Sequence, residues 1–428
     1  MKNLTLNKAK FIIVFLFFTW INSAVLDLEY KESNGFYTIQ MSLGKNGQTF
    51  SAQIDTTTSE IWVPSKNTSL EAVDIQRYDT DSSKSAELTK RIFEIDGERG
   101  SVKGFATFDS VEIGQFYLKR MGFVQVTEFT MDFHDYLGGK LGLGYRQEHG
   151  DEFDWLRELK KNNLIKYEMF TINPEEQQLI IGEFPSDYNM EEYSFCNLTE
   201  VEDLDDKYRA GWVCEMTHIF CGVDTDTRSL ETALDLDSRV IFDSGYNYIS
   251  IPIRHLEKFK TQFLHKLFDD SCLEFQIEDH VSFVCDNDDH IPQSSIAFVI
   301  GGKGYIIRGE NLFKQIEDDK YEMLIRFRKE NDNIITLGTP FFNQFSITFD
   351  SENKHVGFYG GETINVKKEW DGYMSGDSIA EKEEKMKKLM ILICVFGGIL
   401  LLIVVCLIIK SCRKQSAELV KYENKDVV

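Results

Sequence analysis

The chain has 428 residues, 42 % of them hydrophobic, which is enough for two or three domains with substantial cores. Its formal net charge of −23 argues against a nucleic-acid partner, because nucleic acids are themselves polyanions. An acidic balance suits a protein of an acidic lumen, but many cytosolic proteins are equally acidic, so the charge selects no compartment.

The first residues have a pattern typical of an export signal. Three lysines precede the apolar run FIIVFLFFTW, and the small residues of INSA follow it. A membrane anchor is the alternative, but this apolar run is too short to cross a bilayer. We therefore predict that residues 1–24 are a signal peptide cleaved near Ala24.

The next and longest region, from about Phe36 to Tyr359, predicts a mainly β fold. Short apolar or alternating runs rich in β-branched and aromatic residues are separated by Gly, Asn and Asp. Examples in chain order are FYTIQMSL, SVKGFATF, SVEIGQFYL, EMFTI, QLIIGEF, NYISIPI and QFSITFD. Helical patterns are few, and the clearest are DEFDWLRELKKN and IRHLEKFKTQFLHKLF.

Two stretches of this β region repeat one another. FSAQIDTTTSEIWVPS, which contains Asp55, and SRVIFDSGYNYISIP, which contains Asp243, share a strand, an Asp, a small hydroxyl residue, a turn, an apolar strand and a Pro. GGKLGLGY and IITLGTPF give each half a later apolar–Gly element. Turn aspartates without a catalytic role are the alternative, but an internal repeat with one carboxylate per half predicts that the two meet at a pseudo-two-fold axis.

The sequence changes character after Gly361. Polar residues 362–388 predict a stalk, and the uncharged apolar run 389–409 has the length of a membrane-spanning helix. Together with the export signal, this order predicts a single-pass type I membrane protein whose residues 410–428 form a cytosolic tail. The ectodomain is expected outside the cell or in the lumen of the secretory or endolysosomal system.

Cysteine and asparagine patterns fit an exported protein. The cysteines before the apolar run are Cys196, Cys214, Cys221, Cys272 and Cys285. An odd number in an oxidising compartment leaves at least one that is unpaired or paired between chains. The sequences NTS at Asn67 and NLT at Asn197 are candidate N-glycosylation sites.

The repeated aspartates suit proton-transfer chemistry. Two carboxylates a few ångströms apart cannot both ionise comfortably, so they hold one proton and titrate as a unit. Such a pair polarises a water that attacks a peptide carbonyl, while the protonated member donates to the developing oxyanion. Hydroxyl groups of Thr56 and Ser244 are expected to lock the two loops by hydrogen bonds.

Across roughly Asp27 to Gly361, the sequence resembles the pepsin-like aspartic proteases. The motifs that carry the resemblance are IDTTTSEIWVPS and IFDSG for the two Asp loops, GSVKGFATFDSVEIG for the strand pair after the flap, LGLGY, and ITLGTPFFNQFSITFDSENKHVGF. The resemblance implies a bilobal, mainly β fold with pseudo-two-fold symmetry, with lobes over residues 25–185 and 186–361. It also implies a peptide or protein substrate in the cleft between the lobes, a hairpin flap over it, and no cofactor.

The resemblance further implies roles for individual residues. Asp55 and Asp243 would be the catalytic dyad of an endopeptidase favoured at acidic pH. The residues that would support the dyad are Thr56, Thr58, Ser244, Gly245 and Trp62. The family carries a disulfide in its C-terminal lobe, which implies that Cys272 pairs with Cys285. The eight histidines show neither HExxH spacing nor a close cluster with cysteine, so we expect no metal site.

Four departures from the family pattern surround the expected dyad. Thr57 stands where the family has Gly, Tyr246 where it has a small hydroxyl residue, and Lys140 where it has an apolar residue. The flap hairpin FEIDGERGSV lacks the family's Tyr, whose place falls near Gly97. The alternative to a working endopeptidase is therefore a catalytically impaired module of the same fold that binds peptide or protein at a membrane, and a purely structural surface protein is a third reading.

Overall fold

The computed structural model describes residues 24–366 with short gaps, and these residues belong to one compact unit that ends at Val366. The gaps are 32–34, 69–74, 98–99, 131–137, 146–149, 187, 190, 200–207, 209, 225–228, 269–270, 278, 287–290, 292–293 and 331. The expected signal peptide up to residue 23, the stalk, the membrane span and the cytosolic tail lie outside the described residues. Within the described part, no helix is long and apolar enough to cross a membrane.

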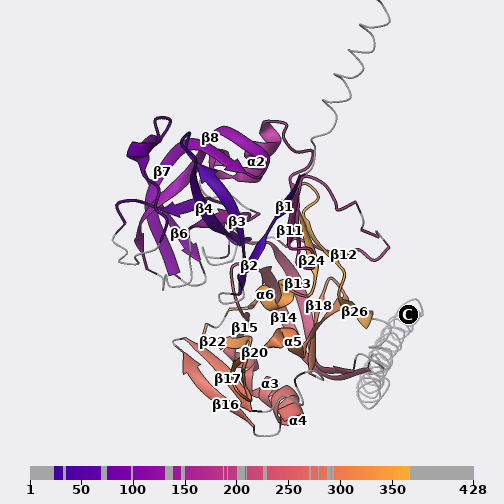
Figure 1. Cartoon of the computed structure of the whole chain (residues 1–428). Coiled ribbons are helices and arrows are strands. Elements are labelled where there is room, and N and C mark those ends of the chain that lie inside the picture. The colour runs from indigo at the N-terminus through magenta and orange to yellow at the C-terminus, as the bar shows by residue number, and fades with distance from the viewer. Residues whose placement is uncertain are drawn as a thin grey trace, which may run out of the picture. The chain divides into compact units, whose positions relative to one another are not determined.

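Three β-sheets form this unit (Figure 1). The first lobe is built on an eight-stranded sheet in the order β2 (Glu29–Lys31), β3 (Phe36–Leu43), β4 (Gln48–Asp55), β9 (Lys140–Gly142), β5 (Trp62–Pro64), β8 (Phe116–Phe129), β7 (Gly100–Ile113) and β6 (Glu87–Gly97). β4 pairs with β9 in parallel and β5 with β8 in parallel, whereas β6, β7 and β8 are antiparallel.

The second lobe is built on a twelve-stranded sheet. Its strands, in order across the sheet, are β20 (Phe313–Glu317), β21 (Lys320–Met323), β17 (His280–Asp286), β22 (Ile325–Arg328), β15 (Ile249–Pro252), β23 (Ile334–Leu337), β14 (Ser229–Phe242), β13 (Val213–Asp224), β18 (Ser295–Ile300), β19 (Lys303–Arg308) and β26 (Glu362–Ile364), with β16 (Cys272–Ile277) paired to β17.

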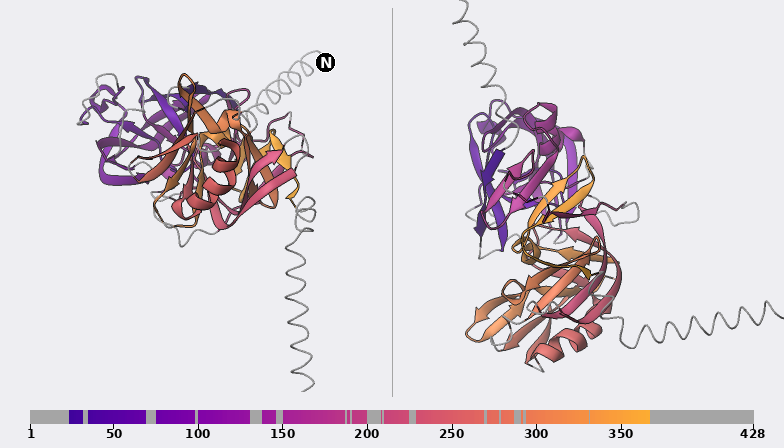
Figure 2. Two further views of the ribbon diagram at one scale, coloured as in Figure 1. Left: turned by 90° about the horizontal axis from the view of Figure 1, so that it is seen from below. Right: turned by 90° about the vertical axis from the view of Figure 1, so that its right-hand side faces the viewer.

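The third sheet joins the two halves of the chain. Its six strands, in order, are β1 (Ala24–Asp27), β11 (Gln178–Ile181), β10 (Met169–Asn173), β24 (Ser346–Asp350), β25 (His355–Tyr359) and β12 (Ser194–Asn197). β10 and β24 pair antiparallel at its centre, with Phe170 opposite Phe349. Figure 2 shows the two lobes on either side of this sheet, which confirms the expected mainly β, bilobal fold.

Helices are short, and the clearest ones lie where the sequence predicts them. The first pattern forms η3 (Asp151–Phe153) and α2 (Trp155–Lys161), with the Asp154 carboxylate accepting a hydrogen bond from the Arg157 N–H as N-cap. The second forms a continuous series: η5 (Ile253–His255), α3 (Leu256–Phe259), the π-helix η6 (Lys260–Leu264) and α4 (His265–Phe268). Single turns in the described part of the chain are η1 (Thr80–Ser82), α5 (Gly309–Leu312) and α6 (Thr339–Phe342).

One expected element differs from the sequence reading. The stretch Gly100–Gly114 was expected to hold a strand pair, but β7 runs through it as one strand to Ile113. The turn falls at Gly114, whose φ of +57° favours glycine, and β8 then returns antiparallel along β7. Register shifts between β7 and β8 let these long strands bend without a break.

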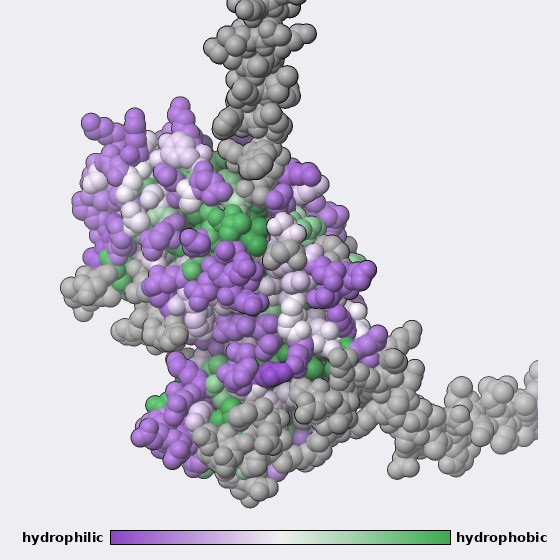
Figure 3. All heavy atoms as spheres, turned by 45° about the vertical axis from the view of Figure 1, so that its right-hand side comes forward, coloured by the Kyte–Doolittle hydropathy of each residue, from purple (hydrophilic) through white to green (hydrophobic). Residues whose placement is uncertain are grey.

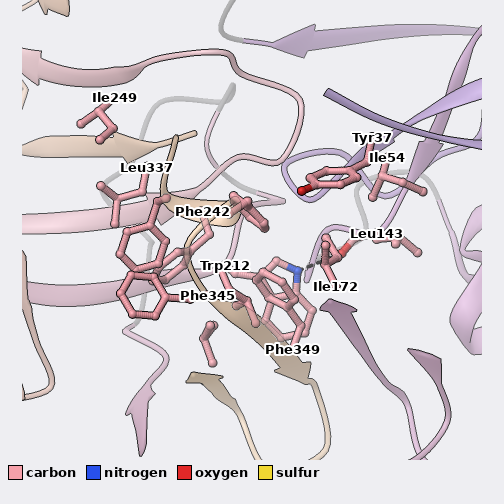
Figure 4. Packing of buried hydrophobic residues seen from close by; sticks show 14 of the residues in the cluster. Tyr37, Ile54, Leu143, Ile172, Trp212, Phe242, Ile249, Leu337, Phe345 and Phe349 are labelled. Carbon is pink, nitrogen blue, oxygen red and sulfur yellow. Dashed lines mark hydrogen bonds between the residues drawn. The ribbon is translucent and has the colours of Figure 1, made fainter. Parts of the chain in front are cut away.

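The hydrophobic core extends from both lobes to the ends of the strands that carry the aspartates (Figure 4). Ile54, directly before Asp55, and Phe242, directly before Asp243, are both fully buried. Trp212 packs its ring 5.1 Å from that of Phe349 and donates its indole N–H to the Leu143 carbonyl at 2.8 Å. Because such interiors are close-packed, the core fixes the positions of both strand ends.

Two disulfides lie in the second half of the described chain. Cys272 and Cys285 face one another on β16 and β17 and are bonded, which confirms the expected pair. Cys196 of β12 is bonded to Cys214 of β13 and links the third sheet to the second lobe. Cys221 is buried on β13 and belongs to neither disulfide. The surface seen in Figure 3 is largely hydrophilic with small apolar areas, in keeping with an acidic globular unit.

Candidate active site

Asp55 is the last residue of β4, a strand of the first lobe. Phe50, Ala52 and Ile54 of the same strand are fully buried, so the core anchors its end. β4 pairs in parallel with β9, with Asp55 opposite Gly142, and the N–H of Leu143 donates to the Asp55 carbonyl at 2.7 Å. The backbone of Asp55 is therefore fixed, and its carboxyl group is not exposed to bulk solvent.

Asp243 is presented in the same way by the second lobe. It directly follows β14, which pairs in parallel with β23, and its N–H donates to the Leu337 carbonyl at 3.0 Å. The strands β9 and β23 are the later apolar–Gly elements of the sequence repeat. Each half thus places its Asp at the end of a strand that pairs in parallel with its own apolar–Gly element.

Two glycines let these elements approach the Asp loops. A Cβ at Gly142 would lie 2.5 Å from the backbone oxygen of Glu60, and one at Gly338 would lie 2.1 Å from that of Tyr246. Real Cβ atoms do not approach backbone that closely, so both positions require glycine. The same steric requirement in both halves explains why the apolar–Gly pattern is visible in the sequence twice.

Reciprocal hydrogen bonds join the two Asp loops. The Thr56 hydroxyl donates to the Phe242 carbonyl at 2.6 Å and accepts from the Ser244 N–H at 3.0 Å. The Ser244 hydroxyl donates to the Ile54 carbonyl at 2.9 Å. All these groups are buried, so the bonds form without competition from water. Thr56 and Ser244 therefore lie where the sequence places a lock between the loops.

The lock brings both carboxyl groups next to Gly245. A Cβ built on Gly245 would lie 3.2 Å from Oδ1 of Asp243 and 3.6 Å from Cγ of Asp55. The Gly245 N–H donates to Oδ1 of Asp243 at 2.8 Å, and its carbonyl accepts from the Gln53 amide at 3.1 Å. Gly245 thus lies close to both carboxyl groups, and Gln53 is a supporting residue that the sequence motifs did not indicate.

Asp55 accepts hydrogen bonds through both of its oxygens. Oδ1 accepts from the Thr57 N–H at 2.8 Å, from the Thr57 hydroxyl at 2.7 Å and from the Thr58 N–H at 3.2 Å. Oδ2 accepts from the ammonium of Lys140. Thr58, one of the residues expected to support the dyad, therefore contributes its backbone N–H, and Thr57 supplies the hydroxyl.

These donors decide the charge of Asp55. Burial by itself raises the pKa of a carboxyl group, but the charge of Lys140 and the hydrogen bonds from Lys140 and Thr57 outweigh it, so the pKa of Asp55 is lowered. The sequence showed Lys140 as a departure beside the dyad without showing the contact. The feature of the sequence that could have indicated this contact is the position of Lys140 in the repeated apolar–Gly element. Lys140 pairs with Gln53, which lies two residues before Asp55 on β4.

The remaining candidate residues surround this centre. Tyr246 is buried, donates its N–H to the Asp243 carbonyl at 3.2 Å, and its ring lies 5.8 Å from that of Tyr248. Trp62 packs beneath the hairpin of β6 and β7, in a cluster with Phe93 and Val102. This hairpin, where the flap is expected, pairs as far as Gly97 and Gly100. Residues 98–99 lie outside the described residues.

A cavity of 720 Å³ lies away from the aspartates. Its lining includes Tyr30, Tyr37 and Asn343, which are joined by hydrogen bonds of 2.8 and 3.1 Å through the Asn343 amide. None of its lining residues belongs to an Asp loop, so the cavity is not part of the candidate active site.

Comparisons with known proteins agree with this geometry. The sequence profile of the family described as eukaryotic aspartyl protease matches residues 36–359. Plasmepsin IV of Plasmodium falciparum is 26 % identical over 331 residues, covering 74 % of this chain and 67 % of the relative. Plasmepsin I of the same organism is 25 % identical over 342 residues, covering 76 % and 69 %. Renin of Canis lupus familiaris is 23 % identical over 344 residues, covering 75 % and 78 %.

Proposed function

Because the chain belongs to the eukaryotic aspartyl protease family, we propose that it is an endopeptidase that hydrolyses internal peptide bonds with a water activated by Asp55 and Asp243. The observation that carries the proposal is the reciprocal hydrogen bonding of Thr56 and Ser244, which brings both carboxyl groups close to Gly245. A pair of isolated turn aspartates would have no need of such a lock.

The chemistry follows from two carboxyl groups that face one reacting centre. One carboxylate takes a proton from the water as its oxygen bonds to the peptide carbonyl carbon, and the developing negative charge on the carbonyl oxygen is stabilised by a donor of the site. The same carboxyl group then returns the proton to the peptide nitrogen as the C–N bond breaks. One water is consumed, and a carboxylic acid and an amine are released.

A catalytically impaired binding module is the second candidate. It is favoured by the contact between Lys140 and Asp55 and by Tyr246, a bulky residue in place of the small hydroxyl expected beside Asp243. Restoring the family residues with Thr57→Gly and Tyr246→Thr should raise turnover if these departures are the impediment. Peptide binding that persists without turnover and is insensitive to both Asp substitutions would support this candidate.

The test of the endopeptidase proposal is cleavage of an unbiased peptide mixture by the full-length chain across roughly pH 3 to 7. Asp55→Asn and Asp243→Asn should abolish cleavage, and Asp318→Asn, at an exposed position of the second lobe, is the matched control. Cleavage by the wild type and the control alone supports the proposal. Equal cleavage by all four proteins would assign the activity to a contaminant and refute it.

We further propose that the protein is a single-pass type I membrane protein anchored through residues 389–409, with its folded unit outside the cytosol. The support is the apolar run itself, the export pattern of residues 1–24, and two N-glycan acceptors, Asn67 and Asn197, whose side chains are exposed. Deletion of 389–409 should release the protein from the membrane fraction. Asn67→Gln and Asn197→Gln should each remove one glycosidase-sensitive mobility shift.

A further inference from the structure

A buried lysine contacts the first aspartate of the candidate active site. Lys140 begins β9 and pairs through its backbone with both β4 and β5. Its ammonium forms an ion pair with Oδ2 of Asp55, and the two side chains are only 10 % and 1 % exposed. The Trp62 ring, 6.0 Å from the ammonium, closes another side of the contact.

The surroundings of Asp55 favour its ionised form. Three donors converge on Oδ1, two from Thr57 and one from Thr58, while Lys140 occupies Oδ2. A carboxylate that accepts this many hydrogen bonds, one of them from a cation, does not readily take up a proton. Asp55 is therefore poorly suited to carry the proton that an aspartate pair would share.

A charge count shows what the lysine changes. Two adjacent carboxyl groups hold one proton between them, so the pair carries a net charge of −1. Two ionised carboxylates with an ammonium also carry −1 and need no bound proton. The second arrangement keeps the same charge over the pH range in which the lysine is charged and both carboxyl groups are ionised.

We propose that the Lys140 ammonium takes the place of the proton that the two aspartates would otherwise share, so that the Asp55–Asp243 pair is fully ionised at neutral pH. This inference rests on the endopeptidase proposal for its role in catalysis. The charge of the site is a property of the folded protein, however, and is measured without turnover.

The hydrolytic step balances without a proton on Asp55. The Asp243 carboxylate takes a proton from the attacking water as the C–O bond forms, and the carbonyl oxygen receives the electron pair beside the ammonium. Asp243 then gives that proton to the nitrogen as the C–N bond breaks. Lys140 remains protonated throughout, and the pair returns to its starting charge.

Other charged groups on the neighbouring elements are few or exposed in the described part of the chain. Glu60, which lies between β4 and β5 in the sequence, is buried. Asp243 of the second lobe lies near Asp55, and both are close to Gly245. The hairpin and β8 carry Glu94, Lys103 and Glu128, whose side chains are half-buried or exposed. Charges on these half-buried or exposed side chains of the hairpin and β8 are screened by solvent.

The first test measures unfolding of the full-length chain in urea from pH 4 to 7. Without the ammonium, the folded aspartate pair must bind one proton, so Lys140→Met should lose stability relative to wild type as pH rises, up to about tenfold in the unfolding constant per pH unit. Lys119→Met, an exposed lysine of β8, and the charge-conserving Lys140→Arg should parallel wild type. Lys140→Gln replaces Lys140→Met if methionine prevents folding.

A Lys140→Met curve parallel to wild type would overturn the proposal, because the pair would then have gained no proton. Adding Asp55→Asn to Lys140→Met should remove the extra pH dependence. If the extra pH dependence of unfolding persists in that double variant, the proton has bound to another group and the proposal also fails.

The second test is the pH profile of peptide cleavage. Wild type and Lys119→Met should retain kcat/KM at pH 7, whereas Lys140→Met should lose about tenfold per pH unit above the pKa of its newly shared proton. Higher activity of Lys140→Met at every pH would show that the lysine only blocks the site and would overturn the proposal. Absence of cleavage in every variant, with the unfolding result retained, would refute the endopeptidase proposal and leave the charge assignment standing.

Discussion

Thr56→Val should show how strongly the two lobes are locked at the aspartates. Valine keeps the shape of threonine but replaces the hydroxyl by a methyl group. In the wild type that hydroxyl, fully buried, donates to the Phe242 carbonyl at 2.6 Å and accepts from the Ser244 N–H at 3.0 Å. Both backbone groups lose their partner in the variant, and water cannot replace it.

The magnitude follows from these two groups. A buried polar group left without a partner costs about 1–3 kcal/mol, so Thr56→Val should lower the free energy of unfolding by about 2–6 kcal/mol. Urea unfolding of the full-length chain measures the loss. Thr49→Val is the matched control, because Thr49 is exposed and its 3.4 Å hydroxyl contact is long, so a change within about 0.5 kcal/mol is expected.

A double-mutant cycle with Ser244→Ala tests whether the two hydroxyls form one lock. Ser244 donates to Ile54 and also binds Thr56, so the two substitutions should couple by about 0.5–3 kcal/mol. Additive effects would show that the hydroxyls act separately. A Thr56→Val loss no larger than that of Thr49→Val would refute the reasoning, because the interlobe bonds would then contribute nothing to stability.

Three further predictions concern the frame around the site. Burial raises the pKa of Asp154 to about 6, above its value in the unfolded chain, so the protonated carboxyl group stabilises the fold at low pH and this stabilisation is lost as pH rises through 6. Urea unfolding should therefore show that Asp154→Asn lowers the free energy of unfolding by about 2–3 kcal/mol more at pH 4 than at pH 7. An equal loss at both pH values would contradict this. Replacing Cys272 and Cys285 together by serine should lower the free energy of unfolding by about 2–4 kcal/mol, as measured against wild type without reductant, and wild type in reductant should move towards the variant. Gly338→Ala should abolish or severely weaken folding, as followed by near-UV circular dichroism, because its Cβ would lie 2.1 Å from a backbone oxygen; Gly47→Ala, with open space but a φ of +67°, should cost only about 1–2 kcal/mol.

The sequence predicts the fold well where local patterns repeat. Alternating β-branched and aromatic runs predict strands, and the doubled Asp and apolar–Gly elements predict two similar halves. The structure confirms the mainly β bilobal fold and the Cys272–Cys285 disulfide. The Cys196–Cys214 bond and the pairing of β10 with β24 were beyond sequence analysis, because they depend on which distant strands share the third sheet.

The sequence predicts which residues form the candidate site but not how their side chains contact one another. Asp55, Asp243, Thr56 and Ser244 follow from the repeat, since a carboxylate and a hydroxyl recur at matching places. The direction of side chains does not follow from a motif. Nothing in the letters TTT shows that the middle hydroxyl, not the last, bonds Asp55, and the target of a long lysine side chain depends on the packing around it.

The two halves share their backbone frame and differ in the groups that set the charge of each aspartate. By register, Thr57 of the first loop corresponds to Gly245 of the second, and Lys140 beside β4 corresponds to Thr336 beside β14. Both differences add donors on the side of Asp55. Where two carboxyl groups share a site, unequal surroundings assign the ionised role to one and the proton-carrying role to the other. The common frame therefore sets where the aspartates meet. The residues that depart from the repeat, Thr57 and Lys140, favour the ionised form of Asp55 and leave Asp243 to take up the proton of the attacking water.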